Sequence, residues 1–448
     1  MSTVHRFPGG IHPHEGKGGK AVTASLPIVQ APQPSRVMIP LKQHIGSVCK
    51  PLVNKGDFVK VGQMIGEPVG AMSAAIHASV SGKVIGCESC IVADGTEQLC
   101  VIIDNDFKDE WVDLQPTQNP ASITGTQLSD IARQMGIVGL GGATFPTAVK
   151  LSIPQDKKVT TLILNGAECE PYLSADHRLM VEQAEQIVSG AKLVKSALGI
   201  EKVLIGIENN KPDAITALQK ACEGINGFEV VSLKVMYPQG GEKQLVYALT
   251  HKTVKAGKLP LDLGIIVMNV GTCYALNRAV YEGRPLIDRI VTVGGCVNNP
   301  ANYCVRIGSP VEWLIDTSKG LLQETKTLIY GGPMMGAAIS REDIPVTKGC
   351  SGIVALDKLS ALAQEGPCIR CGRCIEACPM KLAPATIDRY TRHRMFEEAE
   401  KADAMSCLEC GACAWSCPAR RNLTQSCRTA KHMIKKQQQQ EAAMKGGN

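Results

Sequence analysis

Buried strands and amphipathic helices alternate through the middle of the chain. The apolar runs VTTLILN (159–165) and VLIGIEN (203–209) predict strands, and FEVVSLKV and LGIIVMN continue the alternation. KPDAITALQKACEG (211–224) predicts a helix between two of these strands. One further helical face is formed by Met180, Ala184, Ile187, Ala191, Val194 and Leu198. Such alternation predicts an α/β layer with a parallel sheet.

Polar, glycine-containing segments follow three of these strands: NGAECEP (165–171), YPQGGE (237–242) and NVGT (269–272). The carboxyl ends of parallel strands meet at one edge, where such sheets bind ligands. A fourth loop, IVGLGGATFPTAVKL (137–151), offers bare backbone, a capping threonine and a lysine for an anion. It follows a predicted helix, LSDIARQMGI, rather than a strand, so it is not the dinucleotide fingerprint.

The flanking regions have different patterns. Residues 36–85 alternate apolar and polar positions around glycines and prolines, which predicts a small barrel-like sandwich. This sandwich resembles the hybrid-motif domains that carry biotin or lipoate on a lysine at a hairpin tip. Here the tip, AMSAAIHA, has no lysine, so we interpret the whole domain as a packing or interaction module. His77 at this tip is expected to be solvated or hydrogen-bonded rather than a ligand. Between residues 285 and 345 the runs RIVTVGG, NYCVRIG and KTLIYGG predict short strands that end in glycine.

The composition of the chain excludes several classes of function. The 448 residues carry a net charge of +6, with lysines and arginines scattered among nearly as many acids, so no nucleic-acid partner is expected. No apolar run approaches the roughly 18 residues of a membrane span, and the start has no hydrophobic signal region. Nineteen cysteines in such a chain favour reduced thiols and metal ligation over disulfides.

Two runs of four cysteines, in residues 368–378 and 407–417, share the spacing CxxCxxCxxxC, and a proline follows each run. This is the spacing of bacterial ferredoxins with two [4Fe–4S] clusters, in which the fourth cysteine of each run binds the other run's cluster. The predicted ligands are Cys368, Cys371, Cys374 and Cys417 for one cluster and Cys407, Cys410, Cys413 and Cys378 for the other. The alternative is a pair of zinc ribbons, which usually pair two CxxC knuckles across a longer spacer. Residues 383–404 predict a helix pair between the runs.

The remaining cysteines are expected to be small buried side chains. Cys87 and Cys90 form a CxxC pair with Cys100 beyond, for which an adventitious metal site is the alternative.

The motifs GLGGATFPTAVK, NGAECEPYLSADHRLM, YPQGGEKQ, NVGTCYAL and GGPMMG, with the twin cysteine runs, resemble the C subunit of the Rnf ion-translocating electron-transport complex over nearly the whole chain. The centre is more distantly similar to the flavin- and NADH-binding subunit of respiratory complex I. Where the complex I pattern has an arginine, a glycine and an acid, this chain has Leu140, Thr144 and Ala167.

The resemblance implies FMN and NAD(H) as cofactors beside the two [4Fe–4S] clusters. The implied FMN residues are Gly139, Gly141, Gly142, Lys150, Asn165, Glu168, Tyr237, Gly240, Asn269 and Thr272. Phe145 would stack on the nicotinamide nucleotide and Glu170 would bond to ribose. Ferredoxin and the other Rnf subunits are the implied partners, on the cytoplasmic face of the membrane.

We therefore expect a multidomain α/β electron-transfer enzyme that converts hydride transfer into one-electron transfer. The expected parts are a barrel-sandwich-like β domain (1–115), an FMN/NADH-binding α/β domain (116–284), a β-grasp-type linker (285–355), an α-helical two-cluster ferredoxin module (356–432) and a disordered tail (433–448). The alternatives are a soluble flavin/iron–sulfur reductase resembling the cobalamin reductase and a cluster-bearing relay that docks ferredoxin without nucleotide chemistry. The N-terminal barrel argues against the cobalamin reductase.

Overall fold

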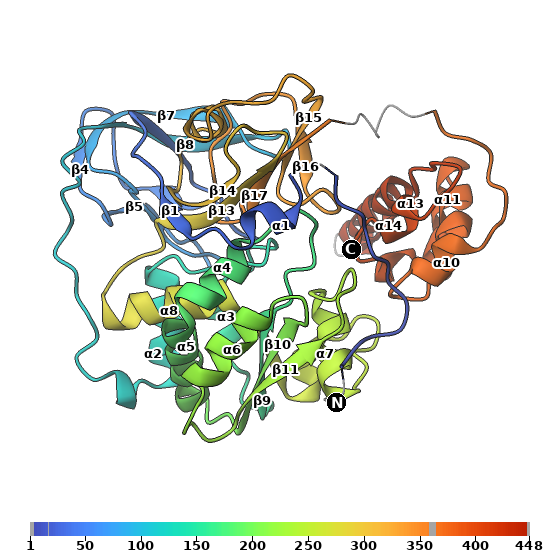
Figure 1. The fold of residues 1–448 in the computed structure, drawn as a ribbon, viewed down its shortest axis with the longest axis horizontal. Coiled ribbons are helices and arrows are strands. Elements are labelled where there is room, and N and C mark those ends of the chain that lie inside the picture. Colours follow the sequence, from blue (N-terminus) through green and yellow to red (C-terminus); the bar gives the residue numbers. More distant parts are fainter. Residues whose placement is uncertain (1–3, 17, 358–363, 446–448) are drawn as a thin grey trace.

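The computed structural model describes residues 4–16, 18–357 and 364–445, with the side chains of 443–445 left out. Figure 1 shows the β-rich parts of the chain above a central α/β domain, with a compact group of helices set to one side. Among the described residues, no helix is both long and apolar enough to cross a membrane.

The N-terminal β domain consists of two small sheets, as the alternating pattern predicts. One has the strand order β2-β8-β7-β4 and the other β3-β5-β6. Their inward side chains, among them Val37, Ile65 and Ile103, are fully buried in a core of their own. The strands are β2 (Arg36–Pro40), β3 (Lys50–Pro51), β4 (Phe58–Val59), β5 (Met64–Glu67), β6 (Ile76–His77), β7 (Gly82–Ile91) and β8 (Glu97–Asn105). His77, expected to be solvated or hydrogen-bonded, is buried and has a hydrogen bond with the backbone of Gln134.

The segment before this sandwich lies on the other domains. His5 forms a bridge to Leu233 and Ile11 forms one to Tyr237, both in the central domain. Further along, helix α1 (Lys20–Thr23) leads to β1 (Ile28–Gln30), which pairs with a linker strand. Residues 4–16 and 18–30, which we call the N-terminal arm, therefore connect the domains.

The central sheet is fully parallel, with the strand order β11-β10-β9-β12. Apolar residues fill a separate core on each of its faces. Its strands are β9 (Thr161–Gly166), β10 (Lys202–Glu208), β11 (Phe228–Leu233) and β12 (Ile265–Asn269). Its helices are α2 (Gly125–Gln134), α3 (Thr147–Leu151), α4 (Ala175–Glu182), α5 (Ala184–Ala197), α6 (Pro212–Ala221), α7 (Glu242–Thr250) and α8 (Val270–Tyr281). The apolar face predicted from Met180 to Leu198 is thus divided between α4 and α5, which break at Gln183.

The linker domain is a six-stranded mixed sheet with the order β1-β14-β13-β17-β15-β16 and one helix. Its elements are β13 (Asp288–Gly295), β14 (Ala301–Arg306), α9 (Val311–Thr317), β15 (Thr327–Tyr330), β16 (Ala337–Ile339) and β17 (Gly352–Leu356). Strand β13 runs antiparallel to β14 and parallel to β17. The three glycine-ended strands expected from the sequence are β13, β14 and β15.

The C-terminal module is helical. It contains α10 (Arg373–Ala377), α11 (Pro384–Arg392), α12 (Phe396–Lys401), α13 (Ala412–Trp415) and α14 (Leu423–Lys445). The predicted helix pair between the cysteine runs is α11 and α12. The prediction of disorder from residue 433 is wrong as far as Lys445, because α14 continues through it; residues 446–448 lie outside the described residues. Buried Cys427, Ala430 and Ile434 anchor the helix, and the following Lys, Gln, Glu and Ala residues have high helix propensity.

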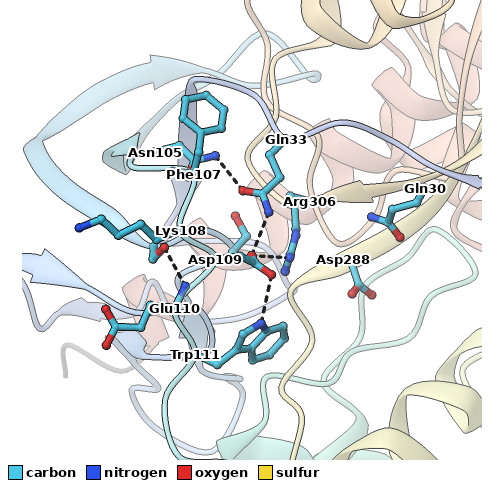
Figure 2. Close-up of polar contacts among 12 residues, drawn as sticks. Gln30, Gln33, Asn105, Phe107, Lys108, Asp109, Glu110, Trp111, Asp288 and Arg306 are labelled. Atoms are coloured by element: carbon cyan, nitrogen blue, oxygen red, sulfur yellow. Dashed lines mark hydrogen bonds and ion pairs between the residues drawn. The ribbon is translucent and has the colours of Figure 1, made fainter.

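A polar network joins the segment after β1, the sandwich and the linker (Figure 2). Asp109, just past β8, accepts hydrogen bonds from Arg306 Nη2 at 2.7 Å, Gln33 Nε2 at 3.0 Å and Trp111 Nε1 at 3.2 Å. Asn105 donates to Gln33 Oε1 at 3.0 Å. Since Gln33 belongs to the segment after β1, this network fixes where the chain enters the sandwich.

A second joint is formed by Lys348 of the linker. Its ammonium, 1% exposed, donates to the carbonyl oxygens of Ala75 in the sandwich at 2.7 Å and Gly136 in the central domain at 2.6 Å. Its backbone amide donates to Gln43 Oε1 at 2.9 Å. Burial lowers the pKa of Lys348 to about 7. One side chain therefore connects three domains.

The Lys348→Met variant should be less stable than the wild type, and increasingly so as pH rises. Unfolded lysine stays protonated up to its ordinary pKa of 10.5, whereas folded Lys348 loses its proton near pH 7. The unfolded state then binds more protons, so the free energy of unfolding of the wild type rises with pH, by up to about 2 kcal/mol between about pH 7 and 8.5. Melting temperatures of both proteins across this range measure the effect. An exposed-lysine variant, Lys83→Met, should show no such trend, and a pH-independent difference for Lys348→Met would contradict the assignment.

Candidate cofactor sites

The glycine loop, residues 138–146, connects α2 to α3. The amide of Gly139 donates to the carbonyl of Phe145 at 2.8 Å, which closes the loop. The amide of Leu140 donates to Thr272 Oγ1 at 3.0 Å, so α8 holds the loop from the side. Between these contacts Gly141 and Gly142 are exposed, and Gly142 has a φ of +103° that favours glycine. Bare backbone thus faces outward at the middle of the loop.

The expected capping role of Thr144 is not observed. Thr144 has a φ of +47°, and α3 begins at Thr147, after Pro146, without a side-chain cap. Phe145, expected to stack on a nucleotide, is half-buried beside the loop.

The loops at the carboxyl edge converge, as expected. Asn165 at the end of β9 donates from Nδ2 to the carbonyl of Gly240 at 2.8 Å. A Cβ atom on Gly240 would lie 2.3 Å from the carbonyl oxygen of Ala167, so only glycine allows this approach. Asn269 ends β12, and a Cβ atom on Gly141 would lie 3.7 Å from its side chain. The glycine loop and three strand ends therefore border one region.

Asn269 has two structural contacts in this region. Its Oδ1 accepts from the amide of Gly271 at 2.8 Å and caps α8, while Nδ2 donates to Asp176 Oδ2 at 2.7 Å. Burial raises the pKa of Asp176, and the hydrogen bond from Asn269 opposes that shift. These two hydrogen bonds fix the orientation of the Asn269 side chain.

Glu168 stabilises the first turn of α4. Its carboxylate accepts from the amides of Asp176 at 2.9 Å and His177 at 3.2 Å. Lys20 of the N-terminal arm donates from Nζ to the carbonyl of Glu168 at 2.6 Å. Burial raises the pKa of Glu168 and lowers that of Lys20. Lys20 had no signal in the sequence, because its contact spans 148 residues.

Lys150 does not point to an open anion site in this structure. Its ammonium donates to Glu242 Oε1 at 3.0 Å and to the carbonyl of Val267 at 2.9 Å. It links α3 to α7 and to β12.

Two other expected cofactor residues contact neighbouring domains instead. Glu170 accepts from the amides of Met334 at 3.1 Å and Met335 at 3.0 Å, in the linker loop after β15, rather than facing an open ribose site. Burial raises the pKa of Glu170 to about 7. The hydroxyl of Tyr237, whose side chain is 1% exposed, donates to the carbonyl of Cys410 at 2.7 Å. Tyr237 therefore joins the central domain to the cysteine-rich module.

The cysteines of the second run gather with the last cysteine of the first. Cys378, Cys407, Cys410 and Cys413 line one cavity, which is the combination that the ferredoxin spacing predicts. Cys427, treated as a solitary cysteine in the sequence, also lines this cavity. A hydrogen bond from Cys427 lowers the pKa of the Cys407 thiol to about 7. Four thiols around one apolar cavity fit a [4Fe–4S] cluster.

The other set lies nearer the surface. Cys374 is buried and packs in one apolar cluster with Cys417, while Cys368 and Cys371 are exposed. Burial and the neighbouring Cys417 and Cys368 raise the pKa of Cys374. Both runs turn at a left-handed glycine, Gly372 with φ +78° and Gly411 with φ +80°. The repeated spacing is thus matched by a repeated backbone turn.

Cys87, Cys90 and Cys100 lie on β7 and β8 as free thiols. In the described parts of the chain, no group of three or more His, Cys, Asp or Glu side chains is arranged to hold a single metal ion.

Three family models match separate parts of the chain. Residues 5–108 match the RnfC barrel sandwich hybrid domain, 132–278 the Nuo51 FMN-binding domain and 361–440 the 4Fe-4S dicluster domain. The fold and the two kinds of site define a flavin- and iron–sulfur-binding electron-transfer protein.

Curated relatives are similar over nearly the whole length. The chain is 47% identical to the C subunit of the Na(+)-translocating ferredoxin:NAD(+) oxidoreductase complex of Acetobacterium woodii, over 97% of this chain and 98% of that protein. It is 46% identical to the C subunit of the proton-translocating ferredoxin:NAD(+) oxidoreductase complex of Clostridium ljungdahlii, over 88% and 86%. The chain belongs to the RnfC family, the C subunits of the Rnf ion-translocating oxidoreductase complexes.

Among solved structures, an NAD+-reducing [NiFe]-hydrogenase has a similar fold. The TM-score is 0.50 at 18% identity, over 72% of this chain and 66% of that one.

The Cys378→Ser variant should lose the cluster of the second run and keep that of the first. Iron content after anaerobic reconstitution should fall from about eight to about four atoms per chain. Cys427→Ser, which changes the same cavity outside both runs, is the matched control and should retain both clusters. Loss of the first-run cluster in the Cys378→Ser protein, seen by EPR, would contradict the exchanged ligand sets.

Proposed function

We propose that this chain is the peripheral electron-transfer subunit of a membrane ferredoxin:NAD+ oxidoreductase, connecting NAD(H), FMN and two [4Fe–4S] clusters. The observation that carries this proposal is the position of the carboxyl edge of the parallel sheet. On one side it meets the glycine loop, and on the other the loop after β11 contacts the cluster module through Tyr237 and Cys410. Flavin and cluster sites would then be neighbours within one chain.

FMN, when bound, would supply the exchange between a two-electron hydride and single electrons. The exposed backbone of Gly141 and Gly142 would receive its phosphate, and Gly139 and Thr272 would hold the loop that presents it. Asn165 and Gly240 would border the flavin from the strand ends. Asn269, between the loop and Asp176, would form the remaining side of the flavin site.

The other predicted residues would position the elements around the flavin site or contact the nucleotide. Glu168 would keep α4 in position, and Lys150 would fix α3 against α7. Phe145, half-buried at the end of the glycine loop, is the aromatic surface on which a nicotinamide nucleotide would stack. Glu170 and Tyr237 would then be positioning residues, since their polar atoms already bind the linker and the cluster module.

The fold details extend the same proposal. We interpret the six-stranded linker as a β-grasp-type domain that sets the distance between flavin and clusters. The proposed domain limits near 115 and 284 lie between secondary-structure elements, whereas the limit at 355 falls one residue before the end of β17, and β1 pairs with the linker sheet. Ion translocation, Na+ or H+, would reside in membrane subunits to which this chain attaches on the cytoplasmic face.

Asn269→Asp should weaken FMN binding. The substitution retains an oxygen that can cap α8 but places a carboxylate where Nδ2 now donates to Asp176, beside the region proposed for an anionic cofactor. Like-charge repulsion of about 1.4 kcal/mol would raise the Kd for FMN about tenfold. Fluorescence quenching during FMN titration measures it. Asn269→Ser caps the helix without adding charge, so equal losses in both variants would contradict the electrostatic explanation.

Anaerobic titration of the reconstituted wild type with NADH should bleach the flavin absorbance and then produce the EPR signals of reduced clusters. In Cys378→Ser, the flavin should still bleach. If FMN binds to the wild type but NADH leaves it oxidised, the chain is a relay without nucleotide chemistry, and the proposed function is wrong.

A further inference from the structure

The two cluster sites differ in their access to solvent. In the site lined by Cys378, Cys407, Cys410 and Cys413, the three cysteines Cys378, Cys410 and Cys413 are only 7–8% exposed. In the first-run site, Cys368 and Cys371 are exposed. The chain therefore has one inner and one outer cluster site.

The inner site is enclosed by other domains. Tyr237 of the central domain donates to the carbonyl of Cys410, and the amide of Gly10 in the N-terminal arm donates to the carbonyl of Ala377 at 3.2 Å. Gly411, which opens the turn of the second run, lies against Met334 of the linker loop. Protein covers this site on the side of the proposed flavin region.

The outer site has a mixed apolar and basic surface. Ile369, between two of its cysteines, is 65% exposed. Arg370 in the same loop and Arg373, the first residue of α10, are exposed, and neither forms an ion pair within the described chain. Arg420 is also exposed, and its neighbour Ala419 accepts from the amide of Gly366 at 2.9 Å, which brings it to the start of this loop. We call Ile369, Arg370, Arg373 and Arg420 the outer face.

The arginines of the outer face differ from others in the module. Arg392 and Arg421 pair with buried Asp388 at 2.7 Å and 2.5 Å and so stabilise the fold. The nearest acid on α10 is Glu376, which is exposed and offsets only part of the charge of the three arginines. The outer face thus has unused positive charge around an exposed apolar side chain.

We propose that the outer face is the docking surface for an acidic iron–sulfur protein and that electrons pass between partner and chain through the first-run cluster. This inference rests on the proposed function. Positive charge around the site would steer an acidic partner and raise the rate of association, and Ile369 would exclude water at the centre of the contact. The second-run cluster then lies between the flavin and the outer cluster. Each step moves one electron from a reduced centre to an oxidised one, with no bond made or broken.

The test uses the reconstituted holoprotein and a purified acidic ferredoxin. Arg370→Glu/Arg373→Glu should raise the Kd at low ionic strength at least tenfold and flatten its dependence on salt, measured by calorimetry. The matched control is Lys55→Glu/Lys83→Glu, which changes the net charge equally on exposed lysines of the sandwich. It should bind like the wild type. Equal weakening in both variants, or none in the arginine variant, overturns the docking surface.

Three further measurements distinguish failure of the docking surface from loss of a cluster or of the flavin site. Arg420→Glu lies outside the first cysteine run and tests the same face if the double variant loses iron. NADH should reduce the remaining cluster in Cys371→Ser but not in Cys378→Ser, because only the latter lacks the inner cluster; the reverse result overturns the order. Flavin bleaching by NADH in each arginine variant reports separately on the proposed function, which can fail while docking holds.

Discussion

One buried amino group, that of Lys348, holds the segment just before the glycine loop against two neighbouring domains. A buried amine without partners is costly, and here two backbone carbonyls satisfy it. Those carbonyls belong to Ala75 in the sandwich and Gly136 at the end of α2, so the three domains share the contact. The depressed pKa of Lys348 is the expected consequence of this burial. The position of the loop therefore depends on domains distant in the sequence.

A second buried cation continues this support. Arg289 of β13 donates to the carbonyl of Leu140 at 3.2 Å and to that of Cys350 at 3.2 Å. Leu140 stands where the more distant complex I pattern has an arginine. In this chain the cation comes from the linker and binds the backbone of the loop, leaving Gly141 and Gly142 exposed. The loop can thus be rigid although few of its own side chains are charged.

Local patterns predicted the parts of this structure that depend on local chemistry. The parallel sheet follows from apolar runs, and the gathering of Cys378 with the second cysteine run agrees with the spacing of those cysteines. Long-range contacts were beyond sequence reasoning: Glu170 meets residues 164 and 165 positions away, and Tyr237 meets Cys410 at a separation of 173. The continuation of helix α14 beyond residue 432 was missed because polar composition resembles disorder, whereas the packed first turns of the helix determine that continuation.

Apolar packing and long-range hydrogen bonds both hold the flavin region against the cluster module. A small apolar core there contains Ile11 of the arm, Tyr237, Ala377 and Ala412, with Met334 of the linker against it. Interfaces between domains allow relative motion unless they are large and apolar, and this one is small. The arm adds backbone hydrogen bonds on both sides, from Ile11 to Tyr237 and from Gly10 to Ala377. Because the arm is hydrogen-bonded to both the central domain and the cluster module, movement of the cluster module must break contacts at the edge of the flavin region. The arm therefore couples the geometry of the two sites.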